Sequence, residues 1–131
     1  MPDYTIVNLL ELDDATQGNV PGIQARFARS HMASRDLGIS HHRYEANTRS
    51  PGNGHSHREQ EEAFVVIAGS GRVRLDDEVH EIRRWDIVRI GPPVVRAFES
   101  GPDGLEMLAI GGPKPEGGDG VQSETPWPDQ A

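Results

Sequence analysis

The chain contains no cysteine among its 131 residues. This absence excludes disulfide bonds, thiolate nucleophiles and every metal site built on cysteine sulfur, including zinc fingers and iron–sulfur clusters. It also favours an intracellular location, since small secreted domains usually depend on disulfides. A signal peptide's basic segment and apolar core are missing from the first residues, MPDYTIVNLL, and no apolar run approaches the roughly 20 residues that cross a bilayer. We therefore expect a soluble, cytoplasmic protein without a membrane partner.

Positive charge is scarce as well. The chain has 13 Lys and Arg against 21 Asp and Glu, which gives a formal net charge of −8. A negative chain repels phosphate backbones, and its basic residues are scattered rather than gathered on one stripe, so nucleic acid is not an expected partner. The sequence also lacks a Gly-x-Ser-x-Gly elbow, a P-loop and a dinucleotide fingerprint, which excludes the enzymes that depend on those motifs.

Helical patterning is almost absent, and short β-type segments recur instead. We expect strands at 4–10, 23–28, 37–45, 62–68, 72–75, 79–82, 87–90, 94–98 and 105–110, with turns at 69–71 and 100–104. Short strands at this spacing, punctuated by glycine and proline, are typical of an antiparallel sandwich or barrel. A length of 131 residues with 34% hydrophobic content indicates one domain.

We place that single β-barrel domain at residues 1–110. Residues 111–131 are rich in glycine and proline and poor in apolar side chains, so we expect a mobile C-terminal tail. Trp127 is the only sizeable anchor in it. That side chain could dock on the barrel or on a partner subunit, or remain disordered, and disorder is the expectation.

The segment GHSHREQEE, which begins at Gly54, carries the chemistry. Side chains alternate between the faces of a strand, so His55 and His57 project the same way. The polar run 58–61 can reverse the chain before the next strand, which places Glu62 at its start. Two neutral imidazoles and one carboxylate suit a divalent first-row metal with open positions for substrate, oxygen or water. The alternative is a polar loop whose histidines face water.

This spacing resembles the first motif of the cupin superfamily, which runs glycine, five residues, His-x-His, three or four residues, Glu, six residues, glycine. Here four residues separate His57 from Glu62, and six more lead to Gly69, whereas Arg49 stands where the opening glycine would fall. Glu61 is a competing carboxylate, because a gap of three residues also occurs in the family. The spacing to Gly69 favours Glu62 pointing inward and Glu61 outward.

The second cupin motif is recognisable over residues 85–100, although several of its letters differ. Trp85 stands at the opening glycine, Pro93 at the turn glycine and Ser100 at the final asparagine. Arg96 occupies the position of the family's last metal-binding histidine. A guanidinium stays protonated and cannot donate a lone pair, so Arg96 cannot replace that ligand.

Arg96 therefore has three alternatives open to it. It can grip the carboxylate or phosphate of a substrate beside a metal held by three ligands, or pair with Glu62 in a metal-free pocket that binds an organic anion. It can also turn outward to a surface ion pair. We expect Arg96 and His42, which shares a strand face with Tyr44, to contact the substrate, and we leave the catalytic residues unassigned.

The resemblance implies a small all-β cupin, a jelly-roll barrel with a metal site at His55, His57 and Glu62. It implies Fe, Mn, Ni or Zn as the divalent ion and a homodimer as the assembly. The function expected is that of a metal-binding cupin that acts on or binds a small anionic organic molecule, with dioxygenase chemistry first and isomerase or lyase chemistry next. The alternative is a non-catalytic module with a metal-free pocket that binds an organic acid or a sugar.

Overall fold

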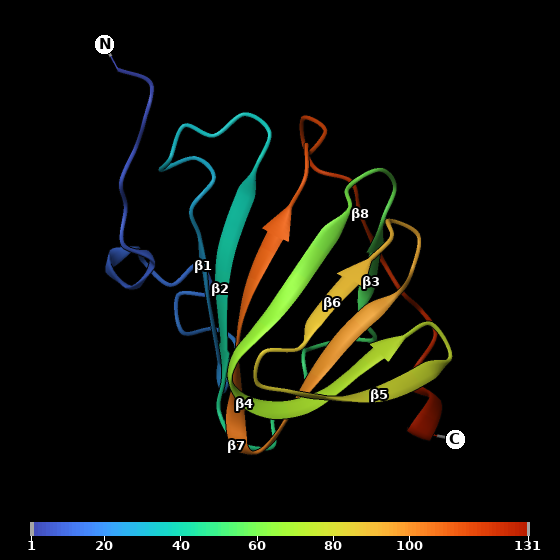
Figure 1. The fold of residues 1–131 in the computed structure, drawn as a ribbon. Coiled ribbons are helices and arrows are strands. Elements are labelled where there is room, and N and C mark those ends of the chain that lie inside the picture. Colours follow the sequence, from blue (N-terminus) through green and yellow to red (C-terminus); the bar gives the residue numbers. More distant parts are fainter. Residues whose placement is uncertain (1, 131) are drawn as a thin grey trace.

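The structure, a computed structural model, describes residues 2–130 as one curled antiparallel sheet (Figure 1). Its strands are β1 (Ile23–Phe27), β2 (Gly38–Tyr44), β3 (His55–His57), β4 (Glu62–Leu75), β5 (Glu78–Arg83), β6 (Ile87–Ile90), β7 (Arg96–Gly111) and β8 (Gly120–Gln122). The strand order is β1-β2-β7-β3-β8, and β4 pairs with β5, β6 and β7. Two 3₁₀ helices, η1 (Leu9–Glu11) and η2 (Pro128–Gln130), complete the elements. The all-β barrel expected from the sequence is confirmed.

Two segments predicted as turns, 69–71 and 100–104, lie inside the long strands β4 and β7. The β4–β7 pairing instead shifts register between Val66 and Ala68 and between Gly69 and Gly71, as it does at β-bulges. Gly69 has a φ of 74°, and a side chain there would collide with the carbonyl of Gly104. Glycine therefore serves here to bend a strand and bring two backbones together, not to end the strand.

The strand predicted at 4–10 is wrong, because that segment pairs with no strand in the described part of the chain. Its last two residues begin η1 instead, where the side chain of Asn8 accepts a hydrogen bond from the amide of Leu10 at 2.9 Å. The outer edge of β1 bonds to a different segment: the amide of Ala15 donates to the carbonyl of Ala25, and the amide of Ala25 donates to Asp14. β-propensity without a free edge to pair with does not make a strand.

The hydrophobic core lies on the inner face of the curled sheet. Its buried residues come mainly from β4 and β7, and they are Ile23, Tyr44, Phe64, Val66, Val73, Ile82, Ile90, Phe98, Leu105, Met107 and Ala109. The rings of Phe64 and Phe98 lie 4.7 Å apart at its centre. His42 belongs to this inner face because it lies two residues from the buried Ser40 and two from the buried Tyr44, and such residues share a strand face.

The segment expected to be a mobile tail lies against the barrel in the structure. Residues 112–130, which we call the C-terminal strap, run along β3 and pack on the barrel. Strand β8 pairs antiparallel with β3, with Ser56 opposite Val121. The side chain of Trp127 is only 1% exposed, and the guanidinium carbon of Arg49 lies 4.1 Å from its ring centroid. Asp129 accepts a hydrogen bond from Arg72 at 2.8 Å. No helix within residues 2–130 is long and apolar enough to span a membrane.

Candidate metal centre

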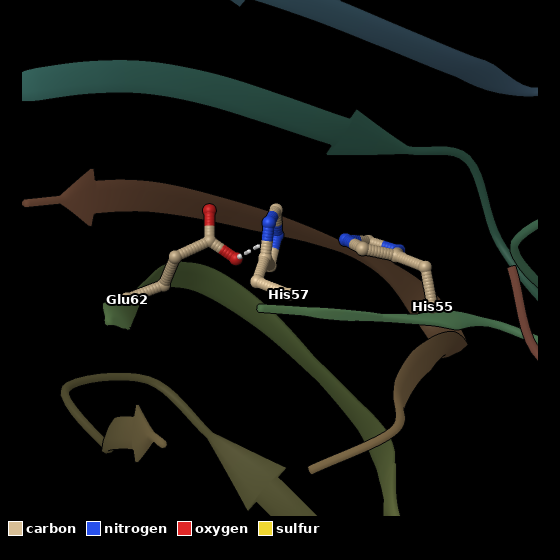
Figure 2. Close-up of side chains that lie close together, drawn as sticks. All are labelled: His55, His57 and Glu62. Carbon is tan, nitrogen blue, oxygen red and sulfur yellow. Dashed lines mark ion pairs between the residues drawn. The ribbon is translucent and has the colours of Figure 1, made fainter. Parts of the chain in front are cut away.

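Strands β3 and β4 bring three potential ligands together. The donor atoms of His55, His57 and Glu62 all lie within 4.8 Å of one another. Figure 2 shows the two imidazoles projecting from the same side of β3, with the carboxylate of Glu62 turned toward His57. The two imidazole centroids are 5.0 Å apart, and all three residues are half-buried. The alternative of a polar loop with solvated histidines does not describe this arrangement.

The backbone around β3 fixes where the histidines point. His55 pairs with Arg96 of β7, and the amide of His57 donates to the carbonyl of Pro92 at 2.7 Å. Gly54, just before β3, has a φ of 91°, and a side chain there would collide with the carbonyl of Arg96. A glycine is therefore required where β3 closes against β7.

The two neighbouring glutamates take opposite faces. Glu61 is exposed and accepts a hydrogen bond from Arg89 at 2.7 Å, which is an ordinary surface ion pair. Glu62 points inward and joins the histidines. The structure therefore places Glu62, the residue favoured by the spacing to Gly69, in the cluster.

Arg96 is fully buried and pairs with Glu62. Its Nη1 donates to Glu62 Oε1 at 2.7 Å, and its side-chain exposure is 0%. Its Nε and Nη2 groups donate to the carbonyls of Gly91, Pro92 and Val94. Burial lowers the pKa of Arg96, and the nearby Glu62 opposes that shift. Of the three alternatives, the contact with Glu62 is the one seen, and the donors expected to grip a substrate are bonded to the protein.

Asp119, in the C-terminal strap, is a site residue that sequence reasoning missed. Its Oδ1 lies 2.8 Å from His57 Nδ1, and its Oδ2 accepts hydrogen bonds from the amides of Glu59 and Gln60, both at 2.8 Å. Burial alone would raise the pKa of Asp119, but these three hydrogen bonds outweigh it and hold that pKa well below its usual value. No motif or spacing ties this glycine-flanked acid to His57, so the sequence carries no signal for it.

The surroundings of the two ring nitrogens of His57 show whether the cluster suits a metal. When neutral His57 donates its Nδ1 proton to Asp119, its Nε2 carries a lone pair. That Nε2 is buried without a hydrogen-bond partner, although it lies within ion-pair distance of Glu62 Oε1, at 3.2 Å. Nε2 and Oε1 repel each other unless a proton or a cation lies between them, and of the two only Oε1 has a cationic partner, the guanidinium of Arg96. The imidazoles of His55 and His57 and the carboxylate of Glu62 would together hold a divalent cation, so the donor set fits a first-row metal.

A third histidine, His42 on β2, lies near Glu62 and His55. Its Nε2 is 2.9 Å from Ser40 Oγ, and its ring contacts Phe27 and Phe64 at centroid distances of 5.8 and 6.0 Å. Burial lowers the pKa of His42 to about 4, with Glu62 opposing the shift. The pKa of His55 is also lowered, by burial first and then by His57 and Arg96. Both imidazoles are therefore neutral near neutral pH, and a neutral imidazole is what a metal requires.

A separate surface hollow of about 570 Å³ lies away from the candidate ligands. It is lined by Arg72, Glu81, Arg83 and Glu99, among others, and by none of the three residues of the cluster. Its central charges already neutralise each other, since Arg72 donates to Glu99 at 2.7 Å. We assign it no role in the candidate metal centre.

Comparison with known proteins identifies the fold. No protein-family model matches the chain, and no curated protein matches it significantly. Solved structures do. A cupin protein from Bacteroides fragilis is similar with a TM-score of 0.70 and 19% identity, over 95% of this chain and 93% of that one. The polyketide cyclase RemF from Streptomyces resistomycificus gives a TM-score of 0.72 at 16% identity, over 94% of this chain and 89% of that one. A sugar phosphate isomerase of the cupin superfamily from Silicibacter pomeroyi gives a TM-score of 0.69 at 14% identity, over 94% of this chain and 96% of that one.

The chain's own structure defines the class of protein first: a small antiparallel β-barrel that carries a cluster of two histidines and a glutamate. The particular fold is that of the cupin superfamily. At identities below 20% the likeness shows the fold, and function rests on the residues of this chain.

Proposed function

We propose that the chain is a metal-dependent cupin enzyme in which His55, His57 and Glu62 hold one divalent first-row transition metal. The observation that carries this proposal is the buried, unpartnered Nε2 of His57 facing the carboxylate of Glu62. A polar atom buried without a partner is costly, and a metal ion relieves that cost. Iron, manganese, nickel and zinc all suit nitrogen and oxygen ligands, so the donor set leaves the metal's identity open.

When bound, the metal would supply Lewis-acid chemistry or a binding position for oxygen. The chain's own residues would hold and orient the reactants. Neutral His42, flanked by Phe27 and Phe64, would offer a hydrogen bond and an apolar wall to a small organic molecule. Dioxygenation is the first reaction class that three protein ligands favour, and isomerisation or cyclisation by a Lewis acid is the next.

The proposed substrate is a small organic molecule that reaches the metal through its own oxygen atoms. Because the guanidinium of Arg96 is bonded to Glu62 and to three carbonyls, it does not supply the anion-binding group. An anionic substrate would instead be attracted by the metal. Arg96 would then act on Glu62, whose negative charge it partly neutralises, and weaken that carboxylate as a ligand.

A second candidate function is supported by the same ion pair. Arg96 already provides a positive charge to Glu62 at 2.7 Å, so a metal-free pocket is electrostatically balanced at that carboxylate. In that case the chain would be a binding module for a small organic molecule, and His42 would contribute to recognition. The homodimer and the cytoplasmic location expected from the sequence stay predictions, and sedimentation analysis of the purified chain would test the first of them.

Elemental analysis of tag-free protein purified without chelators tests the proposal. We expect close to one transition-metal ion per wild-type chain and none in the His55→Ala/His57→Ala variant. His80→Ala is the matched control, because His80 is exposed and lies on β5, which pairs with β4 and not with β3. Wild-type protein that stays metal-free after reconstitution with Fe²⁺, Mn²⁺, Ni²⁺ and Zn²⁺ would refute the metal enzyme and support the binding module.

A further inference from the structure

The contact between Asp119 and His57 joins the C-terminal strap to the candidate metal centre. The two residues are 62 positions apart in sequence, and their side chains are 3% and 11% exposed. Within residues 2–130, neither residue has another ionic partner competing for the Nδ1 contact, since Glu62 lies on the Nε2 side of the ring. The contact therefore places a carboxylate oxygen, which can accept a proton, at Nδ1 of His57.

We propose that Asp119 is a positioning residue that keeps the proton of His57 on Nδ1 and so presents an unprotonated Nε2 to the metal position beside Glu62. The metal half of this inference rests on the proposed function. The proton's location does not, since it depends on hydrogen bonds within the chain. A ligand imidazole commonly donates its second N–H to a carboxylate, which orients the ring and strengthens it as a ligand.

Asp119 is itself held rigidly enough to do this. Its Oδ2 takes amide protons from Glu59 and Gln60, and its backbone carbonyl accepts from the amide of Arg58 at 3.2 Å. The next residue, Gly120, lies opposite His57 in the β3–β8 pairing. With Oδ2 committed to two N–H donors, only Oδ1 faces the imidazole, and an ionised carboxylate oxygen can only accept a proton there.

This geometry makes Asp119→Asn an informative change. The two backbone amides at Glu59 and Gln60 need an acceptor, so the carboxamide oxygen will face them and its NH₂ group will face His57 Nδ1. An NH₂ donor requires Nδ1 to accept, which moves the imidazole proton to Nε2. There it points at Glu62 Oε1 and blocks the lone pair that a metal needs.

The first measurement is the tautomer of His57 in metal-free protein, from long-range ¹H–¹⁵N correlation spectra at mildly alkaline pH. We expect the Nδ1–H form in the wild type and the Nε2–H form in Asp119→Asn. The matched control is Asp103→Asn, at an exposed acid within β7, which should leave the Nδ1–H form unchanged. A wild-type His57 that is doubly protonated or protonated on Nε2 would overturn the proposal, and this result needs no variant to fold.

The second measurement is Zn²⁺ affinity by calorimetry. Loss of such a supporting carboxylate typically weakens metal binding about 10- to 100-fold, and we expect that loss in Asp119→Asn but not in Asp103→Asn. Equal affinity of Asp119→Asn and wild type would overturn the proposal. If neither protein binds Zn²⁺ while the tautomer changes as expected, the proton-positioning role is supported and the metal enzyme is refuted.

Discussion

Trp127 is expected to anchor the C-terminal strap to the barrel. The loss of unfolding free energy on replacing it by alanine measures how much this anchor stabilises the protein. The indole is 1% exposed, with Arg49 stacked over it at 4.1 Å and Arg72 at 5.8 Å from the ring centroid. Two residues further along the chain, Asp129 accepts hydrogen bonds from both arginines. The Trp127→Ala change removes the apolar ring and leaves the two guanidinium groups without the surface they cover.

The magnitude follows from the buried area. A buried tryptophan covers roughly 150–250 Å² of apolar surface, worth about 4–6 kcal/mol at about 25 cal/mol per Å². Ordering the strap's backbone opposes this gain, and the indole Nε1 is buried without a hydrogen-bond partner, which also reduces it. We therefore expect Trp127→Ala to lower the free energy of unfolding by about 3 kcal/mol, at the low end of measured Trp→Ala losses.

Urea unfolding followed by circular dichroism measures this loss. The matched control is Trp85→Ala, because Trp85 is 65% exposed and stacks only on Arg84, so we expect a change within about 0.5 kcal/mol. That control also leaves Trp127 as the only tryptophan, and its fluorescence should be blue-shifted as in a buried indole. A solvent-exposed emission spectrum together with a negligible effect of Trp127→Ala would show that the strap does not dock.

Two further predictions concern the pocket. Arg96→Met should lower the free energy of unfolding by about 3–5 kcal/mol in urea unfolding, because it leaves the half-buried carboxylate of Glu62 without its cation. The same change should tighten Zn²⁺ binding in calorimetry, because the like charge is gone, and unchanged affinity would contradict the assigned role of Arg96. His42 has a folded pKa of about 4 against an ordinary value of 6.5, so its neutral form stabilises the fold fully above about pH 6.5, and that contribution is lost as the pH falls toward 4. The loss of stability is on the order of 3 kcal/mol. The free energy of unfolding of His42→Gln should therefore fall less steeply than that of the wild type between pH 6.5 and 4, and an equally steep fall would contradict this account of His42.

The sequence predicted the parts of the fold in which a local pattern decides the outcome. Strand β6 lies at the predicted residues 87–90, and β1 and β2 agree with their predictions to within one residue at each end. The alternation of His55 and His57 and the spacing to Glu62 predicted which side chains meet. Each of these inferences needs only the geometry of a strand and the residues nearby.

The rest depends on contacts that no local pattern carries. Whether Gly69 ends a strand or bends it is decided by how closely the carbonyl of Gly104 approaches. Arg96 turned to Glu62 because three carbonyls around Gly91 happen to satisfy its other donors. Glycine, proline and few apolar residues predict mobility for the strap, but they carry no signal for the contacts that it makes in the structure, which are the edge of β3 and the arginine pair around Trp127.

The separation of His57 and Asp119 along the chain also bears on the order in which contacts form during folding. A contact that closes a loop of 62 residues forms late, because its entropy cost is met only after nearer pairings such as the β4–β5 hairpin are in place. During refolding, β-structure should therefore be recovered before the histidine acquires its partner. Metal ions added at the start of refolding would meet a barrel in which the imidazole of His57 can still rotate. Metal binding should therefore appear later than the recovery of the circular dichroism signal.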